Sequence, residues 1–164
     1  MSQLVVGISD LKVALPPDTL ITYALGSCVG ICLLDPAVHV SGLSHIMLPD
    51  SKMSPNDRNV MKFADSAIPE LLRQMEMKGA NRSRIKAKIA GGAQMFELAG
   101  GNNPNNTTWQ IGQRNVAAVE ACLRALRIPI VAKDVLLNFG RTVSFDAVTG
   151  IMTVKALNKS VKEL

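Results

Sequence analysis

The chain has 164 residues, of which 48% are hydrophobic and 19% are charged. This composition excludes a disordered protein and predicts a single domain over residues 1–164 with a core of its own. The longest mainly apolar run, from Tyr23 to Leu34, is too short to span a bilayer, so we expect no membrane insertion. No basic region precedes an apolar run at the N-terminus, which argues against a secretory signal and for a soluble protein of the cytoplasm.

The net charge of +5 favours acidic partners, which include nucleic acids and acidic protein surfaces. Aromatic residues make up only 4% of the chain, so few rings are available to stack on bases. The basic residues are scattered, with mild clusters at 82–86 and 124–127, as is typical of solvated faces. We therefore predict no nucleic-acid binding.

Short apolar runs separated by turn residues predict strands in the first part of the chain. In chain order these elements are one or two strands within 3–15, a turn at Pro16-Pro17-Asp18, a strand from Thr19 to Leu25, a bend at Gly26-Ser27, and a hairpin over 29–48. A polar loop is expected to follow from Pro49 to Arg58.

Apolar residues then recur at helical spacing and predict a helix over 56–78. Ser54 and Pro55 have the character of an N-cap followed by proline at the first helical position. Gly79 is expected to end the helix. Pro69 lies inside it and predicts a kink or a break.

The second half of the chain alternates strands with one more helix. Its predicted elements are a half-exposed strand at 84–90, a turn at Gly91-Gly92-Ala93, a long polar loop over 97–110, a helix over 112–127, and strands at 129–137, 141–146 and 151–157, the last two joined as a hairpin. Two main helices among mostly antiparallel strands predict a layered α/β sandwich. Too few helices alternate with strands for a doubly wound parallel sheet.

A cysteine and a histidine fall on the predicted hairpin at positions that suggest chemistry. If Pro36 and Ala37 form its tip, paired residues have numbers that sum to 73, and Cys28 lies directly opposite His45. Their Cβ atoms would then be roughly 5 Å apart on one face of the sheet. A thiol beside an imidazole is the arrangement that yields a thiolate nucleophile near neutral pH. A register change of one residue would send His45 to the other face.

A cysteine hydrolase also needs N–H donors that stabilise the oxyanion. The bend at Gly26 and Ser27 lets the backbone come close to a substrate carbonyl without a steric clash. The backbone N–H groups of Cys28 and its neighbours, from Gly26 to Val29, are therefore candidate donors.

Several side chains are candidates to orient the imidazole of His45. Thr22 lies six residues before Cys28, at the other end of its segment, and its hydroxyl could hold one imidazole nitrogen. The competing candidates are Asp50, Asp35, Ser27 and Ser44. An uncharged orienting group would fix the tautomer but would stabilise an imidazolium less than a carboxylate does.

A zinc site formed by Cys28, Cys32, His39 and His45 is a weaker hypothesis. In the predicted hairpin His39 lies beside the tip, roughly 20 Å along the strand from Cys28 and His45. We expect no metal. We also expect Cys32 and Cys122 to be core residues. The odd number of cysteines, three, fits a reducing compartment better than a disulfide scaffold.

The second predicted helix opens with Gly112-Gln-Arg-Asn115, and its N-terminus could hold an anion. We favour a supporting role in which Arg114 and Asn115 fix neighbouring loops by hydrogen bonds.

Taken together, these segments resemble the CheD family of chemoreceptor glutamine deamidases over nearly the whole chain. The strongest match is Leu25-Gly-Ser-Cys-Val-Gly30 followed by Gly42-Leu-Ser-His45-Ile-Met-Leu-Pro49. Further matches are Ala67-Ile-Pro69 with Leu71-Leu72, Lys88-Ile-Ala-Gly-Gly-Ala93, Ile111-Gly-Gln-Arg-Asn115 and Gly140-Arg141. Each piece alone is common, and their combination is specific.

The resemblance implies an α/β sandwich related in its core to the cytotoxic necrotizing factor toxins. It implies Cys28 as nucleophile, His45 as base and Thr22 as the third member. The implied reaction converts a receptor glutamine to glutamate through a thioester, without a metal or cofactor. A second implied role is that of an adaptor that binds CheC and stimulates its phosphatase activity on phosphorylated CheY. A cysteine peptidase or a transglutaminase would use similar chemistry on another amide.

Overall fold

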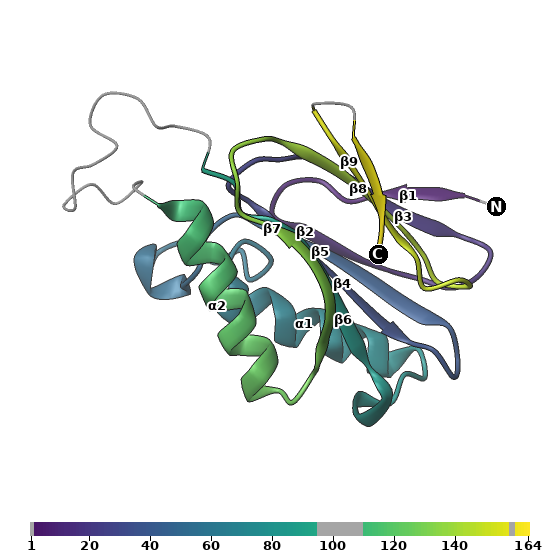
Figure 1. Cartoon of the computed structure of the whole chain (residues 1–164). Helices are drawn as coiled ribbons and strands as arrows, with labels where there is room; N and C mark the ends of the chain where they lie inside the picture. The colour runs from purple at the N-terminus through teal and green to yellow at the C-terminus, as the bar shows by residue number, and fades with distance from the viewer. Residues whose placement is uncertain (1, 95–109, 158–159) are drawn as a thin grey trace.

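The computed structural model describes residues 2–94, 110–157 and 160–164. Over these ranges two five-stranded sheets pack face to face, and two α-helices cover the outer face of one sheet (Figure 1). The sheet without helices has the order β1 (Gln3–Val5), β3 (Thr19–Leu25), β8 (Arg141–Asp146), β9 (Met152–Ala156) and β10 (Val161–Glu163). The helix-covered sheet has the order β2 (Asp10–Ala14), β5 (Val40–Ile46), β4 (Val29–Asp35), β6 (Lys86–Gly91) and β7 (Ile130–Val135).

The helices α1 (Ala64–Met77) and α2 (Ile111–Ala125) pack side by side, and η1 (Ser51–Met53) and η2 (Arg82–Arg84) are single 3₁₀ turns. None of the described helices is both long and apolar enough to cross a membrane. The architecture confirms the predicted layered α/β sandwich. Most strand pairs are antiparallel, whereas β1 with β3 and β6 with β7 are parallel pairs.

The hydrophobic interior has two layers, one on each side of the helix-covered sheet. Ile31 and Leu33 of β4 face the helices, while Cys32 between them packs against the other sheet. This double burial explains why β4 is an unbroken apolar run, since a strand covered on both faces has no solvent side. The expectation that Cys32 is a core residue is confirmed by its complete burial.

The β4–β5 hairpin forms as predicted, but its register differs from the prediction by two residues. Asp35 pairs with Val40 and Gly30 pairs with His45, so paired numbers sum to 75 and the loop spans four residues, 36–39. The predicted direct opposition of Cys28 and His45 is therefore wrong. A shift of two residues leaves every side chain on its original face, because the side-chain period of a strand is two.

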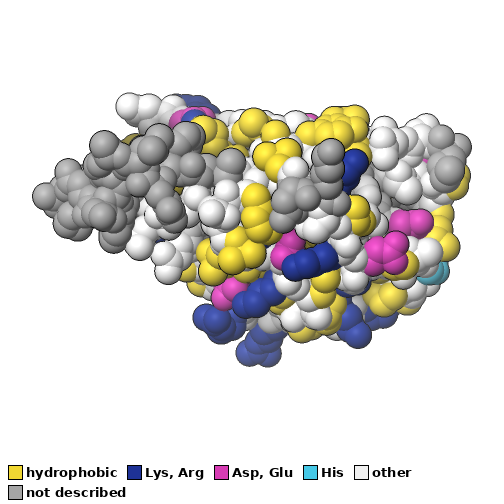
Figure 2. All heavy atoms as spheres, turned by 45° about the horizontal axis from the view of Figure 1, so that its top comes forward, with side chains coloured by type: hydrophobic (Ala, Val, Ile, Leu, Met, Phe, Trp, Pro, Cys, Tyr) yellow, Lys and Arg dark blue, Asp and Glu magenta, His cyan; other side chains and the backbone are white. Residues whose placement is uncertain are grey.

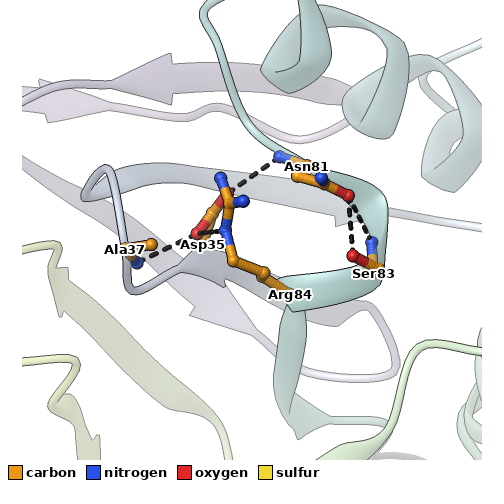
Figure 3. A network of polar contacts seen from close by, with 5 residues as sticks. All are labelled: Asp35, Ala37, Asn81, Ser83 and Arg84. Atoms are coloured by element: carbon orange, nitrogen blue, oxygen red, sulfur yellow. Dashed lines mark hydrogen bonds and ion pairs between the residues drawn. The ribbon is translucent and has the colours of Figure 1, made fainter.

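The wider turn is held by the buried carboxylate of Asp35 (Figure 3). It accepts hydrogen bonds from the N–H of Ala37 at 3.0 Å and from the N–H of Asn81 at 2.8 Å, and it forms an ion pair with Arg84 at 2.8 Å. Asn81 caps the η2 turn and Arg84 is its last residue, and this turn lies far from the hairpin in sequence. A tertiary contact therefore stabilises the four-residue loop that the local Pro36-Ala37 pattern does not predict.

The first helix begins at Ala64, so the predicted start at residue 56 and the predicted cap at Ser54 are wrong. Ser54 instead ends the η1 turn. The chain between η1 and α1 is held by tertiary pairing, since Leu48 bridges to Phe63 beside the end of β5. The end at Gly79 is confirmed, because this residue follows the last turn with a φ of +101°.

Pro69 does not interrupt α1, which is assigned as one continuous helix. The proline lies on the exposed side of the helix, away from the buried face formed by Ile68, Leu71, Leu72 and Met75. The predicted break is wrong for this reason: the packed apolar face maintains the helix despite one missing N–H.

In the second half of the chain the structure confirms β6, α2 and the β8–β9 hairpin close to the predicted bounds. β10 was not predicted from the sequence. The predicted polar loop over 97–110 lies outside the described residues except for Gln110.

Candidate active site

Cys28 lies in the short connection between β3 and β4, where the two sheets meet at one end of the molecule. The β4 strand begins at Val29, which pairs with Ile46 at the end of β5 and with Gly91 at the end of β6. The Cys28 side chain is half-buried and packs against the apolar layer between the sheets. The thiol therefore lies between the two sheets and retains access to solvent.

His45 lies on the same side of its sheet as Cys28. It follows Leu43 by two residues on β5, and Leu43 belongs to the layer between the sheets. Its imidazole is fully buried and reaches across to Thr22 of β3, whose Oγ1 is 2.6 Å from Nδ1. The residues thus come from both sheets: His45 from one and Thr22 from the other.

The hydrogen bonds of Thr22 determine the tautomer of His45. The Thr22 hydroxyl donates to the backbone carbonyl of Val6 at 2.7 Å, and a hydroxyl has only one proton to give. At its second contact it must accept, so Nδ1 of His45 carries the proton. The other nitrogen, Nε2, is then left with a free lone pair, which is what a general base requires.

The Nε2 atom is buried and has no hydrogen-bond partner among the described residues. The Cys28 thiol is therefore not hydrogen-bonded to the imidazole in this conformation. Burial lowers the pKa of His45 to about 4. Burial also raises the pKa of the Cys28 thiol, with partial opposition from its own backbone N–H. The pair rests as neutral thiol and neutral imidazole, in contrast to the thiolate expected from the sequence.

Asn115 of α2 connects the loop that carries Cys28 to the strand that carries His45 by hydrogen bonds. The Asn115 side-chain amide donates to the carbonyl of Ser27 at 2.9 Å and to the carbonyl of Met47 at 3.0 Å. Ser27 precedes Cys28, and Met47 follows His45 by two residues. Two carbonyl acceptors also determine which end of the amide is nitrogen. Asn115 thus links the two chain segments that carry the candidate catalytic groups.

Three glycines allow the backbone of neighbouring segments to approach Cys28 closely. A Cβ at Gly91, where φ is +110°, would collide with the carbonyl oxygen of Cys28. A Cβ at Gly112 would collide with the carbonyls of Gly92 and Ala93. The N–H of Gly92 donates to the Cys28 carbonyl at 2.8 Å. This close packing positions the Cys28 loop against the end of β6 and the start of α2.

The candidate oxyanion donors differ in whether their backbone groups already pair with neighbouring strands. No backbone carbonyl of a described residue accepts a hydrogen bond from the N–H of Gly26, Ser27 or Cys28. Val29 is the first residue of β4 and is paired on both sides in the sheet. The loop residues are therefore better candidate donors than Val29.

The competing orienting groups lie elsewhere. Asp35 is at the opposite end of the hairpin, and Asp50 caps η1 by accepting from the N–H of Lys52. Ser44 faces the helices, because its strand partner Ile31 belongs to that side of the sheet. Ser27 contributes its carbonyl to Asn115. Among the candidates weighed from the sequence, Thr22 is the one that contacts the imidazole.

The residues of the alternative zinc hypothesis are separated in the fold. His39 is in the hairpin loop, where its Nδ1 is 3.1 Å from the carbonyl of Ala147. In the part of the chain that the structure describes, no group of three or more potential metal-ligating side chains comes together. Arg114 is exposed near the start of α2, beside Pro49, Asp50 and Asp65.

Sequence reasoning missed one participant, the carbonyl of Val6. It accepts the Thr22 hydrogen bond that fixes the tautomer. No local pattern marks it, because its role depends on the pairing of the N-terminal segment with β3 and not on the side chain at position 6.

Comparison with known proteins identifies similar chains. Residues 47–156 match the family CheD, described as CheD chemotactic sensory transduction. The chain is 47% identical over 97% of its length to the probable chemoreceptor glutamine deamidase CheD of Lachnoclostridium phytofermentans, of which 96% is covered. It is 46% identical to the chemoreceptor glutamine deamidase CheD of Halalkalibacterium halodurans over 97% of this chain and 96% of that protein. The probable chemoreceptor glutamine deamidase CheD of Clostridium botulinum is 45% identical over 100% of this chain and 99% of that protein.

Proposed function

The chain belongs to the CheD family, and from that premise we propose that it hydrolyses the side-chain amide of glutamines in chemoreceptors, converting them to glutamates. Relatives that match nearly the whole chain are named for this reaction. We further propose that the reaction depends on Cys28 as nucleophile. A free thiol at this position suits a reducing compartment, so we propose the cytoplasm as the place of reaction.

The single observation that carries the mechanism is the hydrogen bond between Thr22 and Nδ1 of His45. It leaves Nε2 unprotonated and without a partner among the described residues, on the side of the sheet where Cys28 lies. Nε2 is proposed to take the Sγ proton as the thiol attacks the amide carbon of the substrate. Catalytic hydrogen bonds are often long in free enzymes and tighten when substrate binds, so Sγ is proposed to approach Nε2 by a side-chain rotation of Cys28.

The remaining steps use the same two side chains. The oxyanion of the tetrahedral intermediate is held by backbone N–H groups of the Gly26–Cys28 loop. Protonated His45 gives its Nε2 proton to the amide nitrogen, which leaves as ammonia, and a thioester remains on Cys28. Water then loses a proton to Nε2 and attacks the thioester, and the products are a glutamate side chain and the free thiol.

Asn115 is proposed as a positioning residue in this scheme. Its two hydrogen bonds keep the Ser27–Cys28 loop and the segment after His45 at a fixed separation. Arg114 is proposed to support the adjacent loops at the start of α2 and has no assigned part in the chemistry.

Replacement of the nucleophile tests the proposal directly. With a purified receptor cytoplasmic fragment as substrate, the wild-type protein is expected to release ammonia and to convert glutamines to glutamates, as seen by mass spectrometry. Cys28→Ala is expected to abolish both signals while unfolding at the same urea concentration, because the substitution is small. Cys122→Ala is the matched control and is expected to remain active. Ammonia release by Cys28→Ala would exclude the covalent mechanism.

Product analysis separates related activities. A transglutaminase would join the receptor glutamine to an added amine, and a peptidase would cleave the receptor backbone. The proposed deamidase gives neither product.

Binding of a CheC-like phosphatase stays a prediction of the family resemblance. Cys28→Ala separates it from the chemistry, since stimulation of the phosphatase by this variant would demonstrate binding without catalysis.

A further inference from the structure

Four large apolar side chains are exposed at the end of the molecule that holds Cys28. They are Tyr23, Leu136, Leu137 and Leu157, which are 50%, 38%, 58% and 74% exposed, and we call them the apolar rim. Figure 2 shows several hydrophobic side chains exposed on the face that turns toward the viewer when the top of Figure 1 comes forward. Scattered apolar residues on a surface need no explanation, but a group around a candidate active site does.

Backbone contacts place the rim beside the nucleophile loop. The N–H of Leu136 donates to the carbonyl of Gly91 at 2.9 Å, and Gly91 packs against Cys28. The β7 strand that ends before Leu136 is separated from β4 by one strand, β6. Two strand spacings correspond to about 10 Å between the two leucines and Cys28.

The rest of the rim comes from the other sheet. The N–H of Leu157 donates to the carbonyl of Gly140, next to Arg141, which pairs with Leu25 at the end of β3. Tyr23 lies in an irregular stretch of the same strand pair. The rim thus draws on both sheets, whose ends flank the loop that carries Cys28.

The two leucines have a backbone conformation that is unfavourable for leucine. Leu136 and Leu137 have φ angles of 68° and 63°, in the left-handed region that glycine and asparagine occupy readily and leucine rarely does. Strain of this kind persists only where the surrounding structure imposes it, and it occurs often at ligand-binding sites. Two consecutive strained leucines with side chains in water gain nothing for folding.

We propose that the apolar rim binds an apolar segment of the chemoreceptor substrate located about 10 Å from the target glutamine. The proposal rests on the proposed function, because it takes the occupant of Cys28 to be a receptor glutamine. The glutamine amide alone offers little apolar surface, whereas the rim provides such surface at the strand ends of both sheets. The segment that binds the rim therefore supplies affinity, and the glutamine next to it is presented to Cys28.

The test replaces both leucines by asparagine, which fits the left-handed conformation. The variant Leu136→Asn with Leu137→Asn is expected to fold with an equal or higher melting temperature, because the backbone strain is relieved. Its KM for a receptor cytoplasmic fragment is expected to rise on the order of tenfold or more, with kcat within twofold of wild type. Val148→Asn is the matched control, since Val148 is 56% exposed in the β8–β9 turn at the opposite end of the sheet.

A second measurement reports on Cys28 itself. The rate of Cys28 alkylation by iodoacetamide is expected to be unchanged in the double variant, because the small reagent makes no use of the rim. An unchanged KM would overturn the proposal. A joint loss of kcat and alkylation rate would also overturn it, since the leucines would then support the thiol structurally. A wild-type dimer that the double variant converts to a monomer would identify a second copy of the chain as the occupant and overturn it too.

The same experiments distinguish an error in the proposed function from an error in the rim proposal. If the wild-type protein released no ammonia from the receptor fragment, the deamidase proposal would fail. Direct binding of the same fragment would still test the rim: weaker binding by the double variant than by Val148→Asn supports it, and equal binding refutes it.

Discussion

Thr22 has one hydroxyl proton, and the destination of that proton decides which nitrogen of His45 can act as a base. Because Val6 takes it, Thr22 is an acceptor toward Nδ1, and Nε2 is the free nitrogen. The orienting group is uncharged, so it fixes the tautomer without a strong preference for imidazolium. Without a charged partner, burial determines the pKa of His45 and lowers it to about 4.

Substitution of Thr22 tests this assignment. Thr22→Val keeps the shape but removes the hydroxyl, so Nδ1 loses its acceptor and the imidazole can adopt the unproductive tautomer. We expect kcat for receptor deamidation to fall on the order of 100-fold, less than the loss seen when a triad carboxylate is replaced. Thr22→Ser keeps the hydroxyl and is expected to stay within a fewfold of wild type. Equal activity of Thr22→Val and wild type would assign the orienting role to another group.

The neutral resting pair has a consequence for pH dependence. His45 must be neutral to take the thiol proton, and its pKa of about 4 keeps it neutral at acidic pH. We expect kcat/KM to remain constant from pH 8 down to about pH 5 and to fall with a midpoint near 4, where an ordinary histidine would already lose activity below pH 7. The measurement is the pH profile of ammonia release. In the free protein, alkylation of Cys28 should accelerate only at alkaline pH, because the thiol pKa is raised; rapid alkylation at pH 6 would indicate an ion pair instead.

At the scale of elements, the β4–β5 hairpin illustrates what the sequence predicts and what it does not. The strands, their order and the shared face of Cys28 and His45 follow from apolar runs and a break at Asp35-Pro36. The register does not follow, because the four-residue loop depends on the Asp35 carboxylate and its contacts with η2, about fifty positions away. The start of α1 was mispredicted for the same reason, since pairing of Leu48 with Phe63 holds the preceding polar residues outside the helix.

The Asp35 contacts are expected to contribute to stability. Burial alone would raise the pKa of Asp35, but the hydrogen bonds from Arg84, Asn81 and Ala37 lower it to about 2. Asp35→Ala would remove a buried carboxylate that accepts three partly buried contacts, so we expect the free energy of unfolding to fall by about 2 kcal/mol in urea titrations at pH 7. Glu76→Ala, which breaks an exposed ion pair with Arg82, is the control and should change it by less than about 0.5 kcal/mol.

The same carboxylate sets a pH window for stability. Its folded-state pKa lies below the value of about 3.9 for an unfolded aspartate, so its contribution is present above pH 4 and is lost as pH falls toward 2. The difference in stability between wild type and Asp35→Ala should therefore shrink over this range. A difference that stays constant down to pH 2 would contradict the assigned charge interaction.

At the scale of the whole molecule, the candidate site belongs to neither sheet alone. His45 comes from the helix-covered sheet, Thr22 comes from the other, Cys28 lies in the loop that connects the two, and α2 contributes Asn115. Sequence patterns identify these residues as candidates and predict the sandwich. They do not predict which strands neighbour one another across the layers, and the contact between Thr22 and His45 depends on that arrangement.

A buried ion pair connects the two sheets at this end of the molecule. Arg141 of β8 is 1% exposed, and its Nε donates to Asp134 of β7 at 3.1 Å while its guanidinium lies over the ring of Phe139. Arg141→Met would leave the largely buried Asp134 carboxylate with Lys162, 3.3 Å away, as its remaining ion-pair partner among the described residues, so we expect the free energy of unfolding to fall by about 3 kcal/mol. The double variant Arg141→Met with Asp134→Asn should recover part of this loss, and strictly additive losses in urea titrations would show that the two side chains do not act as a pair.

The final acceptor behind His45 is a main-chain oxygen, that of Val6. Every amino acid supplies such an oxygen, so the hydrogen bond requires no particular side chain at position 6. The Val6 side chain itself is 1% exposed and packs in the layer between the sheets, so packing and not the chemistry limits its replacement. Apolar exchanges at position 6 that keep the strand geometry should therefore leave the chemistry unchanged, whereas Thr22 and His45 must keep their hydrogen-bonding groups.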